Sequence, residues 1–235
     1  MSLHSSLVKN KKFNGAIEPA LLKHSQEYNV LGILRYLYPQ KYNTMVLGEA
    51  PDLQDKEHST GIEVTVAVSE NDMKASRAFS QLLEKNDETR KRYMNKIEES
   101  GYKLTSIEGN AVSIHTTGTS NGEKTLFQKA IRKKFEKSSN YRKNFKNLGL
   151  AVVFTENPTS EAERSCIAWT REVFQNAQES FDFVYILAHR FCFYYDTHTD
   201  SCEKRIISRN DSYAIKTIAR MTAEGELSLE SDEWL

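Results

Sequence analysis

Two acidic residues of this chain are spaced so that they could hold a divalent metal ion. Asp52 follows Pro51, and Glu63 lies eleven residues further on, inside the segment Gly61 to Val68. Apolar residues alternate with other residues along that segment, as is typical of a strand that presents Glu63 from one face. A carboxylate held in a strand is costly unless its charge is compensated, and a divalent cation is the usual compensation. The spacing therefore predicts a metal site.

The chemistry that such a site would serve is hydrolysis of a phosphodiester bond. That reaction needs an activated water and a cation that neutralises charge on the leaving oxygen, and one or two Mg²⁺ ions can supply both. Mg²⁺ keeps several of its waters and takes one or two protein carboxylates. Asp52 and Glu63 are the predicted ligands, with the carbonyl of Val64 as a backbone ligand.

Other acids nearby are weaker candidates for the same site. Glu49 and Asp55 flank Asp52, while Glu18 and Glu27 lie on the flanks of the first predicted helix, where a solvated position is expected. A purely structural alternative also stands. In that alternative, Glu63 pairs with a lysine or arginine across the sheet and Asp52 shapes a turn.

The motif residues resemble those of a known nuclease superfamily. Pro51-Asp52 and Glu63-Val64-Thr65 are similar to the two halves of the motif of the PD-(D/E)XK, or restriction-endonuclease-like, superfamily. The order helix, hairpin with two acids, third strand, helix and buried strand also suits that core, over roughly Ile17 to Phe154. The resemblance implies a hydrolase that cleaves nucleic acid, expected to be DNA, with Mg²⁺ or Mn²⁺.

One position departs from the family pattern. The family places a lysine, which orients or helps to activate the water, where this chain has Thr65. Some members carry that lysine on the helix after the third strand, and here that helix offers Lys129 and Lys133, one turn apart. If neither serves, the same fold would act without catalysis, as a module that binds nucleic acid or protein.

A basic segment follows the predicted third strand. Between residues 124 and 146 only Glu136 opposes a run of cations, and Phe127, Tyr141 and Phe145 are interleaved. Such a concentration of charge suits phosphate binding, and aromatic rings can stack on unpaired bases. The alternative is a solvated helix whose aromatic residues are core. The predicted nucleic-acid contacts are Lys124, Lys129, Arg132, Lys133, Lys134, Lys137, Arg142 and Lys143.

The elements that must position these residues describe an α/β protein. Hydrophobic periodicity and turn residues predict helices over 17–38, 70–99, 124–137, 161–178 and 214–221, and strands over 44–47, 61–68, 102–104, 111–116, 148–154, 181–187, 191–195 and 204–207. The 44–47 and 61–68 strands are expected to form a hairpin across a polar turn over residues 54–60. We expect a single mixed β-sheet flanked by helices, with a restriction-endonuclease-like core and a C-terminal strand extension. Residues 1–223 would form one domain, and 224–235 an acidic, flexible tail.

Composition limits the other possibilities. The formal net charge is zero, so any attraction to nucleic acid must be local. The three cysteines show no C-x-x-C spacing, which argues against a zinc site and a disulfide scaffold, and Cys192 is expected to be a packed thiol. His58, His115 and His189 lack metal-ligand spacing. With no signal peptide and no membrane-spanning run, a cytoplasmic location is expected.

A further alternative concerns the charged helix predicted over residues 70–99. In that reading the chain is an interaction protein, and this helix packs against a second chain.

Overall fold

The computed structural model describes residues 11, 13, 17–82, 87–107, 110–116, 120–154, 160–175, 177, 180–188, 190–230 and 234. At its centre lies a seven-stranded sheet with the strand order β1-β2-β3-β6-β7-β8-β9. These strands are β1 (Val46–Leu47), β2 (Leu53–Asp55), β3 (Thr60–Ala67), β6 (Asn147–Phe154), β7 (Phe183–Ala188), β8 (Phe191–Asp196) and β9 (Cys202–Ile206).

The sheet is mixed, as the sequence predicts. β3, β6 and β7 run parallel, and the remaining neighbours pair antiparallel. β6 and β7 are almost entirely buried, which explains their continuous apolar runs. The predicted α/β class with one flanked, mixed sheet and added C-terminal strands is confirmed at this level.

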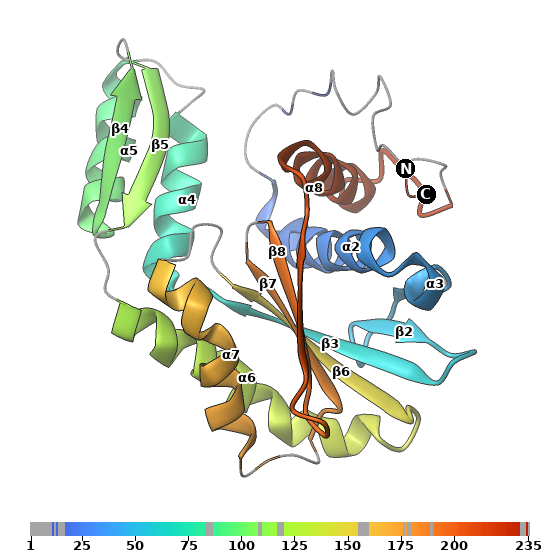
Figure 1. Cartoon of the computed structure of the whole chain (residues 1–235). Coiled ribbons are helices and arrows are strands. Elements are labelled where there is room, and N and C mark those ends of the chain that lie inside the picture. Colours follow the sequence, from blue (N-terminus) through green and yellow to red (C-terminus); the bar gives the residue numbers. More distant parts are fainter. Residues whose placement is uncertain are drawn as a thin grey trace.

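Helices cover both faces of the sheet (Figure 1). One face carries α2 (Pro19–Leu37), α3 (Pro39–Tyr42) and α8 (Arg209–Ala223), and the other carries α6 (Ser120–Tyr141) and α7 (Ser160–Phe174). Each face has its own hydrophobic core. The side chains of β3 alternate between the two cores: Ile62 and Val64 belong to the core on the α2 face, and Ala67 belongs to the core on the α6 face.

The acidic hairpin differs in one respect from the prediction. The 44–47 strand was expected to pair with the 61–68 strand across a polar turn over residues 54–60. Instead β2 lies between β1 and β3, and it contains Gln54 and part of the expected turn. Two short hairpins therefore replace one, because the chain reverses both before and after β2.

Residues 70–116 form a separate small unit, which we call the inserted module. The single helix expected over 70–99 is two helices, α4 (Glu70–Leu82) and α5 (Asp87–Glu99). The following strands, β4 (Tyr102–Ile107) and β5 (Asn110–Thr116), pair only with each other, so the expected third core strand is not part of the seven-stranded sheet.

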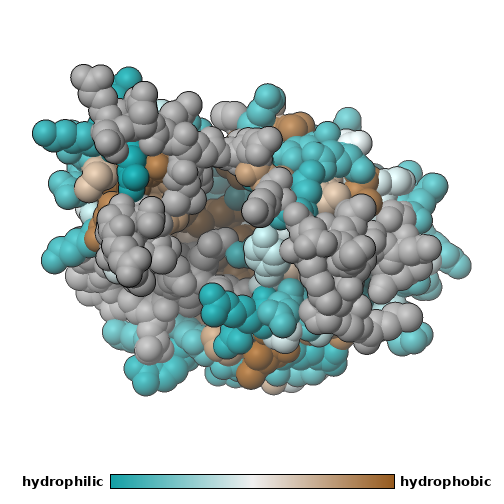
Figure 2. Space-filling view, turned by 90° about the horizontal axis from the view of Figure 1, so that it is seen from above, coloured by the Kyte–Doolittle hydropathy of each residue, from teal (hydrophilic) through white to brown (hydrophobic). Residues whose placement is uncertain are grey.

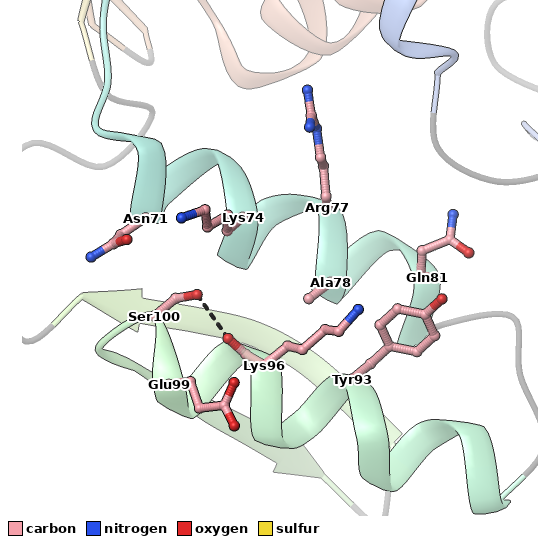
Figure 3. A pocket seen from close by; sticks show the side chains of 9 residues that line it. All are labelled: Asn71, Lys74, Arg77, Ala78, Gln81, Tyr93, Lys96, Glu99 and Ser100. Atoms are coloured by element: carbon pink, nitrogen blue, oxygen red, sulfur yellow. Dashed lines mark hydrogen bonds between the residues drawn. The ribbon is translucent and has the colours of Figure 1, made fainter.

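The inserted module stands beside the main body of the protein (Figure 1). Seen from above, hydrophobic surface lies at the bottom of a hollow in the middle of the view, with hydrophilic residues along part of its edge (Figure 2). Within the module, α4 and α5 line a pocket of about 490 Å³ (Figure 3).

The C-terminal region packs on the main body through Leu227, Leu229 and Trp234. Trp234 is buried, and its indole N–H donates a hydrogen bond to the hydroxyl of Thr222 on α8. Among the described residues, no helix has the length and apolar character needed to cross a membrane.

Candidate functional site

The β2–β3 hairpin sets the backbones of the two predicted metal ligands side by side. Leu53 pairs with Ile62 in this antiparallel ladder, so continuing the register by one step sets Asp52 opposite Glu63. Gly61 leaves room for Pro51 and Phe145, because a Cβ there would lie 2.5 Å from Cγ of Pro51 and 3.0 Å from the Phe145 ring. Both carboxylates are buried, with Asp52 3% and Glu63 1% exposed.

Asp52 occupies the point where the β2 ladder stops. Its Oδ2 accepts a hydrogen bond of 2.8 Å from the backbone N–H of Val64, a donor on β3 beyond the end of β2. Its Oδ1 accepts one of 3.1 Å from the ammonium of Lys23 on α2. The side chain therefore continues the sheet in place of a backbone carbonyl and ties α2 to it.

Glu63 is held from the opposite face by three residues of α6. Its Oε1 accepts hydrogen bonds from Lys134 Nζ at 2.6 Å and Lys137 Nζ at 3.1 Å, and its Oε2 accepts one of 2.8 Å from the Tyr141 hydroxyl. These donors lie at positions i, i+3 and i+7 and so share one side of the helix. The fold therefore contains the lysine–Glu63 pair that the purely structural alternative requires.

Tyr141 connects the two carboxylates electrostatically. Burial, followed by the hydrogen bond and negative charge of Glu63 and then the charge of Asp52, raises the pKa of the Tyr141 phenol well above its ordinary value. Both acids therefore act on the same hydroxyl, and that hydroxyl remains a donor at neutral pH.

A third acid lies beside this pair. Glu27 on α2 is only 2% exposed, so the expectation that it is solvated is wrong for Glu27, whereas Glu18 is exposed. Its Oε2 lies 3.0 Å from His24 Nδ1, and its Oε1 lies 2.9 Å from Lys23 Nζ. The second contact lacks hydrogen-bond geometry, which leaves Oε1 buried without a hydrogen bond.

Lys23 bridges the acids on the α2 side. Its ammonium lies within 3.1 Å of both Glu27 and Asp52, and these carboxylates, Glu27 first, raise its pKa above the ordinary value. Its side chain is 69% exposed, so water reaches the ammonium, but its departure would leave the buried carboxylates of Glu27 and Asp52 without this partner. Three buried carboxylates are thus matched by the ammonium groups of Lys23, Lys134 and Lys137.

The carboxylate oxygens of these acids suit a hard cation that needs few protein ligands. No group of three or more Asp, Glu, His or Cys close enough to share a metal exists among the described residues. Mg²⁺ needs only one or two carboxylates because it keeps its own waters. Asp52 and Glu27 share the Lys23 ammonium, so a cation replacing that ammonium would meet one carboxylate oxygen from each residue.

The structure also shows which lysines reach the site. Thr65, at the motif position, is buried on β3, and α6 supplies an ammonium to Glu63 through Lys134 and Lys137. Lys129 and Lys133, the lysines chosen from the sequence, are exposed. Sequence reasoning found the helix but chose different residues. The i, i+3, i+7 spacing of Lys134, Lys137 and Tyr141 was the available signal.

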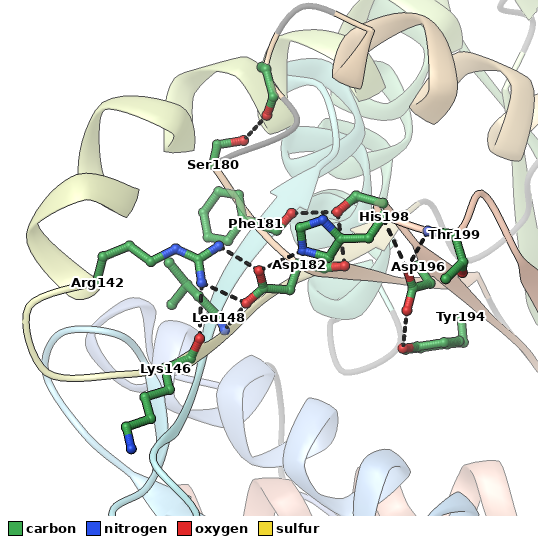
Figure 4. Close-up of polar contacts among 12 residues, drawn as sticks. Arg142, Lys146, Leu148, Ser180, Phe181, Asp182, Tyr194, Asp196, His198 and Thr199 are labelled. Carbon is green, nitrogen blue, oxygen red and sulfur yellow. Dashed lines mark hydrogen bonds and ion pairs between the residues drawn. The ribbon is translucent and has the colours of Figure 1, made fainter.

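Other cations of the basic segment divide into two groups. Arg142 makes a bidentate ion pair with Asp182, with both N–O distances 2.7 Å, and Asp182 also accepts from the Leu148 amide and lies 2.9 Å from His198 Nε2 (Figure 4). Lys124 pairs with Glu172 on α7. The remaining predicted contacts are exposed: Lys129, Arg132, Lys133 and Lys143.

Two further predictions concern single side chains. Cys192 is fully buried, and burial raises the pKa of its thiol to about 12, so the predicted packed thiol is confirmed. His58 lies 2.8 Å from Asp55 in the turn after β2, which accounts for Asp55 without a metal. His189 and the side chain of His115 lie outside the described residues.

Comparison with protein-family models, with curated proteins and with solved structures finds no match to this chain.

Proposed function

We propose that the chain is a divalent-metal-dependent nuclease with a restriction-endonuclease-like core, and that its preferred substrate is DNA. The observation that carries this proposal is the burial of two carboxylates, Asp52 and Glu63, at the end of one short strand ladder, with the Lys134 ammonium 2.6 Å from Glu63. Buried acids placed together beside a lysine are costly for stability alone and typical of a site that handles charge.

The residues would divide the work as follows. Asp52, Glu63 and the carbonyl of Val64 would hold Mg²⁺ or Mn²⁺. When bound, the cation supplies charge neutralisation for the phosphate and lowers the pKa of a water. Lys134 would take the role that Thr65 cannot, by donating a hydrogen bond to the attacking water or a phosphate oxygen.

The exposed cations of α6 would hold the nucleic-acid backbone. Lys129, Arg132 and Lys133 lie on the same helix as Lys134, so a strand bound along them would lead to the carboxylates. Arg142 and Lys124 are less suited to this role because each already pairs with an acid.

A second candidate is a binding module without catalysis. One observation favours it: the ammonium groups of Lys23, Lys134 and Lys137 already neutralise the three buried acids. Such a site is satisfied without a metal, and a protein of this kind would bind nucleic acid but not cut it.

A cleavage assay separates the two candidates. End-labelled single- and double-stranded DNA and RNA are incubated with the purified chain in Mg²⁺, in Mn²⁺ and in EDTA. We expect metal-dependent cleavage that falls by at least about a hundredfold in Glu63→Gln and in Asp52→Asn, the size expected for losing one charge-stabilising group. Metal-dependent cleavage by Lys134→Met should fall by a similar factor.

Matched controls use the same chemical changes elsewhere on the chain. Glu172→Gln alters an acid on α7 that pairs with Lys124, and Lys204→Met alters a lysine on β9 that pairs with Glu163. Both should keep most of the activity. Binding without cleavage under every metal condition would favour the binding module, and cleavage that survives Glu63→Gln would refute the site.

A further inference from the structure

The inserted module interrupts the chain between the two elements that carry the candidate site. It begins directly after β3, which holds Glu63, and it ends directly before α6, which holds Lys134. Within the described residues, its helices and strands make their extensive contacts with one another. It also has its own small core of Ala78, Leu82 and Ile97. The module is therefore a separately packed unit tethered at both ends to the proposed catalytic site.

The pocket between α4 and α5 is rich in cations. Lys74 and Arg77 of α4 and Lys96 of α5 line it, against the single acid Glu99. Lys96 and Tyr93 turn from α5 toward α4, whereas Arg77 extends from α4 on the side away from α5 (Figure 3). In a chain with no net charge, this local excess favours an anionic ligand.

These cations are not used by the fold. The Lys74 ammonium is 3.9 Å from Glu70, at the limit of an ion pair, and both side chains are mostly exposed. Arg77 and Lys96 form no ion pair with any side chain that the structure describes. Lys96 instead lies 5.3 Å from the centre of the Tyr93 ring. Exposed pairs of this kind contribute little to stability, so the cations are available to a ligand.

The other lining groups define the ligand more closely. Tyr93 offers an aromatic ring and Gln81 an amide, which suit the face and the edge of a base. The pocket volume of about 490 Å³ is within the range that holds small organic ligands. A phosphate group alone would leave the ring and the amide unused, whereas a nucleotide unit uses them together with the cations.

We propose that this pocket binds one nucleotide unit of a single-stranded nucleic acid, with the base on Tyr93 and the phosphate on Lys74 and Lys96. The inference rests on the proposed function, because it makes the module the part that holds the substrate strand beside the carboxylates. An unpaired base is required, since a base inside a duplex cannot present its face to Tyr93.

The test is a binding titration that does not depend on cleavage. Anisotropy of fluorescein-labelled dT12 is followed in EDTA with the full chain carrying Glu63→Gln, and dTMP and inorganic phosphate serve as competitors. Lys96→Glu and Lys74→Glu are each expected to weaken binding about tenfold and to reduce the salt slope by about one unit. Lys91→Glu makes the same change at an exposed position of α5 outside the pocket and should change affinity less than about twofold.

Tyr93 supplies an independent readout. Tyr93→Leu should weaken binding at least about fivefold through lost stacking, while Tyr93→Phe keeps the ring and should bind as the parent does. Because Tyr93 also packs on the module core, thermal unfolding of each variant shows whether the module remains folded.

The outcomes separate this inference from the proposed function. Unchanged dT12 binding in folded Lys74→Glu and Lys96→Glu variants would overturn the pocket, even if the wild-type chain cleaves DNA. Equal affinity for dTMP and dT12 would also overturn it, because the ligand would then be a free nucleotide. Weakened binding in these variants, together with no cleavage by the wild type, would support the pocket and refute the nuclease.

Discussion

Replacing Glu63 tests how the fold tolerates a buried carboxylate surrounded by donors. Glu63→Gln keeps the size of the side chain and one carbonyl acceptor but removes the negative charge that faces Lys134, Lys137 and Tyr141. The two lysines are not equivalent. The Lys134 side chain is 16% exposed and that of Lys137 is 54% exposed, so only Lys134 would be left as a charge with little access to water.

The expected magnitude follows from this difference. Removing one partner of a fully buried ion pair costs about 3–5 kcal/mol, and the partial exposure of Lys134 places Glu63→Gln at about 2–3 kcal/mol. For a chain of this length, each kcal/mol corresponds to a fall of about 2–4 °C in melting temperature. The coupling energy between Glu63 and Lys134 should be about 1.5–3 kcal/mol, against about 0.2–1 kcal/mol for Lys137.

Two double-mutant cycles in urea measure these energies. One combines Glu63→Gln with Lys134→Met, and the other combines it with Lys137→Met. In the first cycle, Lys134→Met should recover part of the stability lost in Glu63→Gln, because it removes the unpaired ammonium. An equal or larger coupling for Lys137, or no loss of stability in Glu63→Gln, would refute the assignment of Lys134 as the buried partner.

Three other predictions concern separate parts of the chain. Burial alone would raise the pKa of Asp182, but hydrogen bonds led by that from Arg142 lower it below the ordinary 3.8. Its ionised form therefore stabilises the fold above that pH, and this stabilisation is lost as pH falls through the lowered pKa. Midpoints of urea unfolding measured from pH 6 to 3 should depend less on pH in Asp182→Asn than in the wild type. Millimolar Mn²⁺ should raise the melting temperature of the wild type, but not of Asp52→Asn, if the cation binds there; equal shifts would contradict the site. Charge reversal at Lys129 and Lys133 should weaken binding to all DNA sequences alike, and should reduce the dependence of log affinity on log salt concentration by about one unit per lost contact. Fluorescence anisotropy in rising salt measures both, and a sequence-dependent effect would argue against phosphate contacts.

Local pattern was sufficient for most strands of the sheet and for the strand that carries Glu63. The alternation around Glu63 indicates which face of the strand carries it, because side chains in a strand alternate strictly. The continuous apolar run of β6 predicts a strand buried on both faces, and its helical flanks predict the α/β class.

Local pattern was not sufficient for the inserted module. The charged segment from Glu70 to Glu99 has a helical composition throughout, and the break into α4 and α5 leaves little trace in its periodicity. Likewise, the sequences of β4 and β5 are compatible with pairing at the edge of any sheet. Only the packing of α4 and α5 on this hairpin selects a separate sheet for them.

The partners of the acids depended on the tertiary structure. A sequence shows that α6 is basic, but the side of the helix that meets β3 depends on its rotation and crossing point, which distant core residues such as Phe127 and Ile131 determine. That rotation directs Lys134, Lys137 and Tyr141 to Glu63 and leaves Lys129 and Lys133 exposed. The burial of Glu27 has the same origin: the sequence specified an acid on a helix, and the docking of α2 against the sheet decided that water would not reach it.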